Sequence, residues 1–201
     1  EKAAKKGRIA SISGFGEKSQ EDILRAIGEF KKGIGKNVRM NLPYAYGIAQ
    51  KIVSYLEKCA AALRIELLGS LRRMMPTVGD IDIGVATDNP GKVIEYFVKY
   101  PYKERIVEKG DTTASIVVSG GREIDLMTMP PRSFGALLQH LTGSKSHNVH
   151  LREYSLQKNL SLSEYGIKRQ MANGRWQMEN FSSEEKFYNA LGMEWIPAEM
   201  R

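Results

Sequence analysis

The sequence has 201 residues, with 30 lysines and arginines against 23 aspartates and glutamates, so its formal net charge is +7. A basic balance of this kind favours a polyanionic partner such as nucleic acid. Hydrophobic residues make up 42% and charged residues 26% of the chain, which is typical of a folded globular protein and argues against extended disorder. Because Cys59 is the only cysteine, an intramolecular disulfide is excluded and a cysteine-based zinc site is disfavoured.

No apolar run approaches the roughly 18 residues that a membrane-spanning helix needs, so no membrane partner is expected. The apolar pattern instead predicts short elements of both kinds. In chain order these are a helix over 44–63, strands over 64–68 and 80–85, a helix over 93–98, strands over 114–118 and 123–129, and helices over 133–141 and 147–159. Gly120-Gly121 predicts a hairpin turn, Asn173-Gly174 predicts another, and Ser182-Ser183-Glu184-Glu185 is typical of a helix start with acidic residues in its first turn.

Three aspartates on predicted strands are the most informative residues. In the alternating strand over 80–85, Asp80 and Asp82 share the face opposite the apolar residues. Asp125 lies between two apolar residues of a later strand, so its side chain points away from theirs. Two carboxylates at i and i+2 can share a divalent ion, and a third from a neighbouring strand can complete a site for two ions. Alternatively, an isolated Asp-x-Asp is simply a solvent-exposed strand face.

The type of ligand indicates the type of chemistry. Hard carboxylate oxygens, without a nearby cysteine or histidine cluster, favour Mg²⁺ or Mn²⁺ over zinc. Two such ions about 3.5–4 Å apart can activate an attacking oxygen and stabilise a leaving phosphate oxygen. The three aspartates therefore predict phosphoryl or nucleotidyl transfer.

A turn at Gly69-Ser70 follows the predicted strand over 64–68 and precedes the first two aspartates. The Ser70 hydroxyl and the backbone amides after Gly69 are predicted to hold a triphosphate. Arg72 and Arg73 follow immediately, and at least one of them is predicted to neutralise phosphate charge. Taken singly, these residues fit an ordinary turn with solvated basic side chains. The order of the turn and the aspartates favours phosphate binding.

A second glycine-containing turn lies near the start of the chain, at Gly14 and Gly16 in Ile12-Ser13-Gly14-Phe15-Gly16-Glu17-Lys18-Ser19. Such a turn between two short helices exposes backbone amides at a helix start, where a DNA phosphate can be held without base recognition. The segment has the form of a helix-hairpin-helix element. The alternative is an ordinary glycine-containing loop between helices.

Together these motifs resemble DNA polymerase family X, the group of DNA polymerase beta and the bacterial and archaeal repair polymerases. The resemblance extends over nearly the whole sequence. Its segments are the hairpin element at 11–19, Gly-Ser-Leu-Arg-Arg at 69–73, Gly-Asp-Ile-Asp at 79–82, Glu-Ile-Asp at 123–125, Leu-Thr-Gly-Ser at 141–144 and Leu-Ser-Leu-Ser-Glu-Tyr at 160–165. The hairpin and the Thr-Gly-Ser segment distinguish a polymerase from smaller nucleotidyltransferases.

The resemblance implies an α/β (α+β) fold built around a nucleotidyltransferase palm with a mixed sheet at 38–131. A helical DNA-binding subdomain with the helix-hairpin-helix is expected at 1–37, and a small nucleotide-side α/β subdomain at 132–201. Two departures from the family pattern stand out. His140-Leu141 replaces the aromatic pair of animal members, and Glu123 stands where the best-known members have arginine.

The resemblance also implies individual roles. Asp80 and Asp82 ligate both of two Mg²⁺ or Mn²⁺ ions, and Asp125 ligates the catalytic ion beside the primer 3′-hydroxyl. The implied nucleotide-binding residues are Arg39, Gly69, Ser70, Arg73, Gly79 and Asn148. The implied DNA-binding residues are Gly14, Gly16, Lys18 and Arg152. Backbone carbonyls of Ala10, Ile12 and Phe15 are expected to bind a monovalent cation, Na⁺ or K⁺, that bridges to a DNA phosphate.

The expected function is therefore that of a DNA-directed DNA polymerase, which adds a deoxynucleotide to a primer 3′-hydroxyl and releases pyrophosphate during short-gap repair. Primer-template or gapped DNA and deoxynucleoside triphosphates are the expected partners, and a cytoplasmic, nucleoid-associated monomer is the expected state. Two alternatives remain, a nucleotidyltransferase with a non-DNA acceptor and a catalytically silent DNA-binding module. Because family members commonly carry lyase and phosphoesterase domains, we expect either a trimmed fragment or a minimal natural polymerase.

Overall fold

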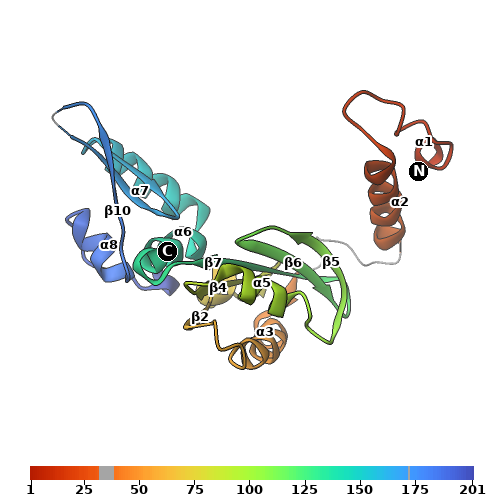
Figure 1. Ribbon diagram of the computed structural model, residues 1–201, viewed down its shortest axis with the longest axis horizontal. Helices are drawn as coiled ribbons and strands as arrows, with labels where there is room; N and C mark the ends of the chain where they lie inside the picture. The colour runs from red at the N-terminus through yellow and green to blue at the C-terminus, as the bar shows by residue number, and fades with distance from the viewer. Residues whose placement is uncertain (32–38, 172) are drawn as a thin grey trace. The chain divides into compact units, whose positions relative to one another are not determined.

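The computed structural model describes residues 1–31, 39–171 and 173–201. The chain divides into two compact units, Glu1–Val38 and Arg39–Arg201, which are described separately (Figure 1). Helices and strands are interspersed along the chain, so the fold is mixed α/β. Within the described ranges, no helix is both long enough and apolar enough to cross a membrane.

The first unit contains a one-turn helix, α1 (Lys2–Lys5), and a longer helix, α2 (Glu17–Lys31). Turns connect them, and the side-chain oxygen of Gln20 in α2 accepts hydrogen bonds from the backbone N–H groups of Ile9 and Ala10, each at 3.2 Å. Gly14 has a φ of +87°, a backbone conformation that favours glycine. The segment that precedes the glycine turn is therefore tied to the first part of α2.

The second unit is built on a five-stranded mixed sheet with the order β2-β4-β7-β6-β5. Its strands are β2 (Arg64–Leu67), β4 (Ile81–Ala86), β5 (Lys103–Lys109), β6 (Thr113–Val118) and β7 (Arg122–Met129). Strands β4 and β7 are parallel, and the other neighbouring pairs are antiparallel. The predicted hairpin between β6 and β7 is confirmed, with Gly120 and Gly121 both at positive φ in its turn.

One face of this sheet is covered by α3 (Leu42–Leu56) and α5 (Pro90–Phe97). Alternate residues of β4, β6 and β7 pack against these helices in the largest apolar cluster, which includes Ile83, Ile116 and Leu126. Both helices start with an asparagine cap, since the Asn41 and Asn89 side chains accept hydrogen bonds from the backbone N–H groups of Tyr44 and Lys92.

The predicted helix over 44–63 is wrong at its carboxyl end, because α3 ends at Leu56. The N–H of Cys59 donates to the Leu56 carbonyl and the N–H of Ala62 to the Cys59 carbonyl, each at 2.9 Å, so these residues form turns. Cys59 is buried from a turn position. The three-residue apolar spacing from Leu56 to Cys59 therefore continues past the end of the helix. The chain then turns and enters β2, which pairs with β4.

The opposite face of the sheet packs against α6 (Phe134–Thr142), which follows a short 3₁₀ turn, η1 (Pro131–Ser133). Phe134, Leu137 and Leu138 of α6 form an apolar cluster with residues at the ends of β2, β4 and β7. A short helix, α4 (Gly69–Arg72), follows β2, and two-residue strands β1 (Met40–Asn41) and β3 (Thr77–Val78) pair with each other.

The last third of the chain forms α7 (Lys145–Leu156), the antiparallel strands β8 (Leu160–Ser163), β9 (Gly166–Gln170) and β10 (Trp176–Glu179), then α8 (Glu184–Ala190) and a final 3₁₀ turn, η2 (Ala198–Met200). These elements enclose their own apolar cluster, with Leu151, Ile167 and Phe187 at its centre. The predicted turn at Asn173-Gly174 joins β9 to β10, and Ser183 caps α8 as its sequence indicated.

Candidate active site

The three predicted aspartates meet at one end of the parallel strand pair. Asp82 on β4 and Asp125 on β7 are direct register partners, and Asp80 immediately precedes β4. One carboxylate oxygen from each lies within 4.8 Å of the others. This convergence confirms that residues 43 positions apart in the chain share one site. Three oxygen donors in such a cluster suit a divalent cation of the Mg²⁺ type.

The cluster concentrates negative charge. The pKa of the Asp82 carboxyl is raised to about 7, first by burial and then by the charges of Asp80 and Asp125, while Arg73 acts to lower it. Like-charged carboxylates that share a site disfavour joint ionisation. A bound divalent cation would remove this penalty, so the electrostatics of the residues present fit a metal site.

Gly69 makes room for one of these carboxylates. Its φ is +57°, and a Cβ atom at this position would lie 2.0 Å from Oδ2 of Asp82. Any other residue would therefore both strain the backbone and collide with the carboxylate. The glycine of the predicted phosphate-binding turn is in direct contact with the predicted metal site.

The two arginines after this turn have different surroundings. Arg73 donates from one terminal nitrogen to the Thr142 carbonyl, while its Nε is buried and makes no hydrogen bond with any residue that the structure describes. Arg73 is also a positive charge that acts on Asp82, so it is placed to attract an anionic ligand beside the carboxylates. The predicted phosphate role therefore fits Arg73.

Arg72 instead belongs to a buried ion-pair network. It donates to the Thr142 hydroxyl at 2.6 Å and to Oε2 of Glu184 at 2.5 Å. Arg201 donates to the other oxygen of Glu184 at 2.7 Å, and both Glu184 and Arg201 are buried. The sequence indicated only that Glu184 suits a helix start. Its burial between two arginines, which joins α4 to α8, was missed.

Arg39 lies beside the loop that leads to Asp80. Its Nε donates to the Thr77 hydroxyl at 2.8 Å and a terminal nitrogen donates to the Thr77 carbonyl at 2.6 Å. Its other terminal nitrogen is 3.3 Å from the position that a Cβ of Gly79 would take. The pairing of β1 with β3 thus brings Arg39 and Gly79, two predicted nucleotide-binding residues, into contact.

Two predicted site residues, Asn148 and Arg152, lie on α7 in different surroundings. The Asn148 side chain donates to the His140 carbonyl at 2.7 Å and accepts from the Gln139 amide at 2.9 Å. Both partners belong to α6, so Asn148 fixes α7 against α6. Arg152, one turn further on, is exposed. Burial lowers the pKa of His140, which stands at one of the departures from the family pattern.

The predicted DNA-binding residues of the first unit lie on its turn and helix start. Gly14 and Gly16 are exposed, and Lys18 is exposed in the first turn of α2. The carbonyl of Ile12 accepts a hydrogen bond from the Phe15 N–H at 2.9 Å, so Ile12 and Phe15 belong to one turn. Ala10, the third residue whose carbonyl is predicted to bind a monovalent cation, lies two residues before this turn.

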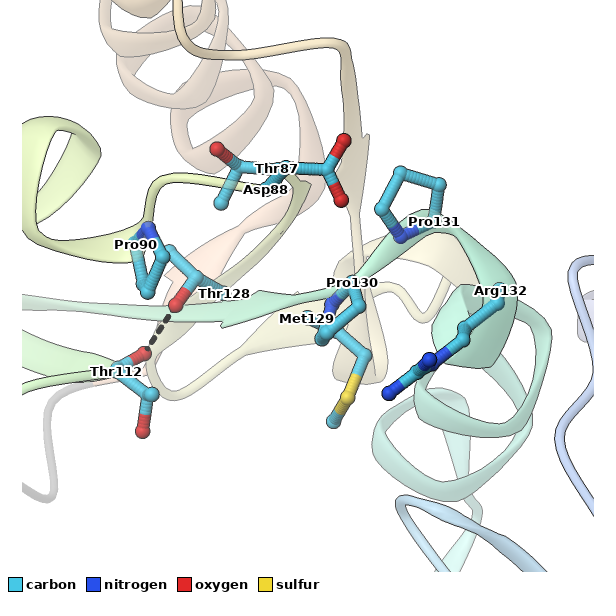
Figure 2. Close-up of a pocket in the computed structure, with 9 residues that line it drawn as sticks. All are labelled: Thr87, Asp88, Pro90, Thr112, Thr128, Met129, Pro130, Pro131 and Arg132. Atoms are coloured by element: carbon cyan, nitrogen blue, oxygen red, sulfur yellow. Dashed lines mark hydrogen bonds between the residues drawn. The ribbon is translucent and has the colours of Figure 1, made fainter.

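A cavity of about 510 Å³ opens at the other end of β4 and β7, where both strands finish (Figure 2). Asp88 and Arg132 line it, and the Thr128 hydroxyl donates to the Thr112 carbonyl at its edge. None of the predicted site residues is among the residues that line this cavity. The chemistry-bearing side chains gather at the amino ends of the parallel strands instead.

A mixed sheet that presents three carboxylates beside a glycine-serine turn is the arrangement expected for metal-dependent phosphoryl or nucleotidyl transfer. The comparisons agree with that class. Residues 137–201 match the family model described as the DNA polymerase beta thumb. The chain is also 34% identical over 201 residues to the DNA polymerase/3′-5′ exonuclease PolX of Bacillus subtilis (strain 168), in an alignment that covers 99% of this chain.

The chain resembles DNA polymerase family X in both comparisons. It spans about a third of the length of its Bacillus relative, since the alignment covers 34% of that protein. The resemblance inferred from the motifs is thereby confirmed.

Proposed function

We propose that this chain contains the nucleotidyl-transfer centre of a DNA-directed DNA polymerase, which extends a primer 3′-hydroxyl by one deoxynucleotide and releases pyrophosphate. The observation that carries the proposal is the meeting of Asp80, Asp82 and Asp125 within 4.8 Å beside the Gly69 turn. We further propose short-gap filling in DNA repair as the reaction's setting, in an intracellular monomer. Similarity to a family X polymerase and the net charge of +7 support a DNA substrate.

Two Mg²⁺ or Mn²⁺ ions bound by the carboxylates would supply an activated attacking oxygen and charge stabilisation at the leaving phosphate. Asp80 and Asp82 would contribute oxygens to both ions, and Asp125 would contribute one to the catalytic ion. Clustering of the three carboxylates, and the raised pKa of Asp82 in the absence of an ion, support this assignment.

The triphosphate is held by the turn next to these carboxylates. Ser70 and the backbone amides after Gly69 donate to phosphate oxygens. Arg73 adds positive charge from beside Asp82, and Arg39 adds it from beside Gly79. Positive groups placed where charge develops on the leaving group lower the barrier to transfer. Asn148, fixed against α6, contacts the incoming nucleotide.

Three subdomains, at 1–37, 38–131 and 132–201, contribute DNA contacts. Gly14, Gly16 and Lys18 bind a backbone phosphate at the start of α2. The Ala10, Ile12 and Phe15 carbonyls would hold Na⁺ or K⁺, which would supply positive charge for that phosphate. Arg152 lies against the template strand. Exposure of Lys18 and Arg152 supports these contacts, as does the match of 137–201 to a polymerase thumb.

Single-nucleotide insertion into gapped duplex DNA tests the proposal. Asp80→Ala and Asp125→Ala are expected to slow insertion by about 1,000-fold or more, because each removes several kcal/mol of transition-state stabilisation. Asp88→Ala is the matched control, since Asp88 is an exposed aspartate at the far end of the same strand. It should insert at the parental rate.

Three results would contradict the proposal. Insertion at the parental rate by Asp80→Ala would remove the catalytic assignment. Pyrophosphate release that is independent of DNA would indicate a different acceptor. Tight binding of gapped DNA by a parent chain that inserts no nucleotide with Mg²⁺ or Mn²⁺ would indicate a silent DNA-binding module.

A further inference from the structure

Ser115 on β6 is the direct cross-strand partner of Asp125 on β7, and its hydroxyl donates a hydrogen bond to Oδ1 of Asp125. Direct partners in an antiparallel pair point to the same face, with Cβ atoms about 4.5–5.5 Å apart. On its other side, Asp125 is the register partner of Asp82. Asp125 thus lies between a like-charged carboxylate on one strand and a hydroxyl donor on the other.

The pleat of β6 explains why Ser115 occupies this position. Ala114, Ile116 and Val118 are buried in the cluster under α3 and α5, so Ser115 projects to the face that carries the carboxylates. Its neighbours on that face are Thr113, opposite Met127, and Val117, opposite Glu123. Within β6, the register places a hydroxyl donor directly across from a predicted metal ligand only at Ser115.

The contact matters because an ionised carboxylate has several orientations and accepts hydrogen bonds without donating any. A donor on Oδ1 restricts rotation of the Asp125 side chain and offsets the repulsion from Asp82. Glu123 lies on the same face two residues earlier, but a carboxylate offers no donor. A donor for Asp125 is supplied by the neighbouring strand.

We propose that Ser115 is a positioning residue for the divalent-ion site, acting through its hydrogen bond to Asp125. The inference rests on the proposed metal-binding role of the three aspartates. Partners that hold metal-ligating carboxylates typically change metal affinity by 10–100-fold when they are removed. Loss of the Ser115 hydroxyl is accordingly expected to weaken ion binding at the low end of that range, about tenfold.

The test measures Mn²⁺ affinity of the chain without DNA, from the electron paramagnetic resonance signal of the free ion. Ser115→Val and Ser115→Thr place nearly the same volume at this position, but only threonine keeps the hydroxyl. Ser115→Val should bind Mn²⁺ about tenfold more weakly than the parent, and Ser115→Thr should remain close to it. Thr113→Val is the matched control, because it removes a hydroxyl from the same face opposite Met127.

Thermal unfolding with a chelator present shows whether each variant is folded, and Ser115→Ala replaces Ser115→Val in the comparison if valine prevents folding. Equal Mn²⁺ affinity for the parent, Ser115→Val and Ser115→Thr would overturn the inference. Equal weakening by valine and threonine would also overturn it, because the effect would then come from packing. The proposed polymerase function fails separately, if a parent chain that binds Mn²⁺ inserts no nucleotide.

Discussion

Gly69 and Asp82 approach each other so closely that the turn tolerates no side chain. A Cβ at Gly69 would lie 2.0 Å from Oδ2 of Asp82, and φ is +57°. Gly69→Ala must displace the carboxylate, and the left-handed backbone adds roughly 1–2 kcal/mol of strain. A displacement of about 1 Å at a reacting centre can slow catalysis about 100-fold. We therefore expect nucleotide insertion by Gly69→Ala to fall by about that factor.

The control for this variant is Gly47→Ala. Gly47 is exposed within α3, and a Cβ there meets no atom within 4 Å among the described residues. Alanine should stabilise the helix by up to about 1 kcal/mol and leave insertion unchanged. Parental insertion by Gly69→Ala would mean that Asp82 need not occupy the position observed.

Asp82 also gives the metal-free protein a pH dependence. Its pKa is raised to about 7 by burial and then by Asp80 and Asp125. A raised pKa means that the folded state binds a proton more tightly than the unfolded state does. The resulting stability is fully present below about pH 4 and is lost as pH rises through about 7.

Urea unfolding from pH 5 to pH 8, with a chelator present, checks this expectation. The free energy of unfolding should fall across that range in the parent, and Asp82→Asn should flatten the fall because the amide does not titrate. Identical slopes for the two proteins would show that Asp82 is not the titrating group.

The ion-pair network of Glu184 holds α4 and α8 together. Glu184 is buried between Arg72 and Arg201, and the side chain of Arg201 is fully buried. Removing one partner of a buried ion pair leaves uncompensated charge and typically destabilises a protein by about 3–5 kcal/mol. Glu184→Ala should therefore lower the free energy of unfolding by about this amount. Urea denaturation measures it.

Glu95→Ala provides the comparison at the surface. Glu95 pairs with Lys109, and both side chains are about half exposed. Solvent-exposed ion pairs contribute little to stability. The urea unfolding curve of Glu95→Ala should therefore overlay that of the parent. If Glu184→Ala unfolded at the same urea concentration as Glu95→Ala, the network would have no structural role.

Elements with a regular apolar pattern were predictable from the sequence. Strand β4 alternates strictly, and β6 and β7 are separated by two glycines, so both the strands and the position of the aspartates followed from local pattern. Strand β5 was not predicted, because Lys103–Lys109 is an edge strand that is mostly exposed and carries charged residues. The end of α3 was also missed. Cys59 lies in a turn but is buried, three residues after Leu56, so the apolar pattern there is the same as in a helix.

The candidate site was predictable only in part for a similar reason. The aspartates and Gly69 belong to contiguous motifs. The contacts of Ser115 and Glu184 depend on register and packing between segments distant in sequence. Arg72 illustrates the limit, since a basic residue beside a phosphate-binding turn can serve either a phosphate or a buried glutamate, and only the fold distinguishes them.

The net charge of +7 should be visible in the binding of the whole chain to DNA. Each phosphate contact releases counterions from the DNA. The logarithm of the association constant for duplex DNA therefore falls linearly with the logarithm of the salt concentration, by about 0.9 per contact. Arg152→Ala should reduce that slope by about one unit. Lys92→Ala, on α5 and the opposite face of the sheet from the aspartates, should leave it unchanged.

Fluorescence anisotropy with labelled gapped DNA, from about 50 to 200 mM salt, gives these slopes. An unchanged slope for Arg152→Ala would remove Arg152 from the DNA path. Equal reductions for Arg152→Ala and Lys92→Ala would mean that the charge acts diffusely, without a defined face.

The proposed two-ion site makes a direct prediction about the number of divalent ions bound in the complex with DNA and nucleotide. The chain would be combined with gapped DNA that ends in a dideoxy primer and with the matching deoxynucleoside triphosphate, and bound Mn²⁺ counted by electron paramagnetic resonance. We expect two ions per chain, and no more than one after Asp125→Ala. A parent complex that binds no more Mn²⁺ than Asp80→Ala would contradict it.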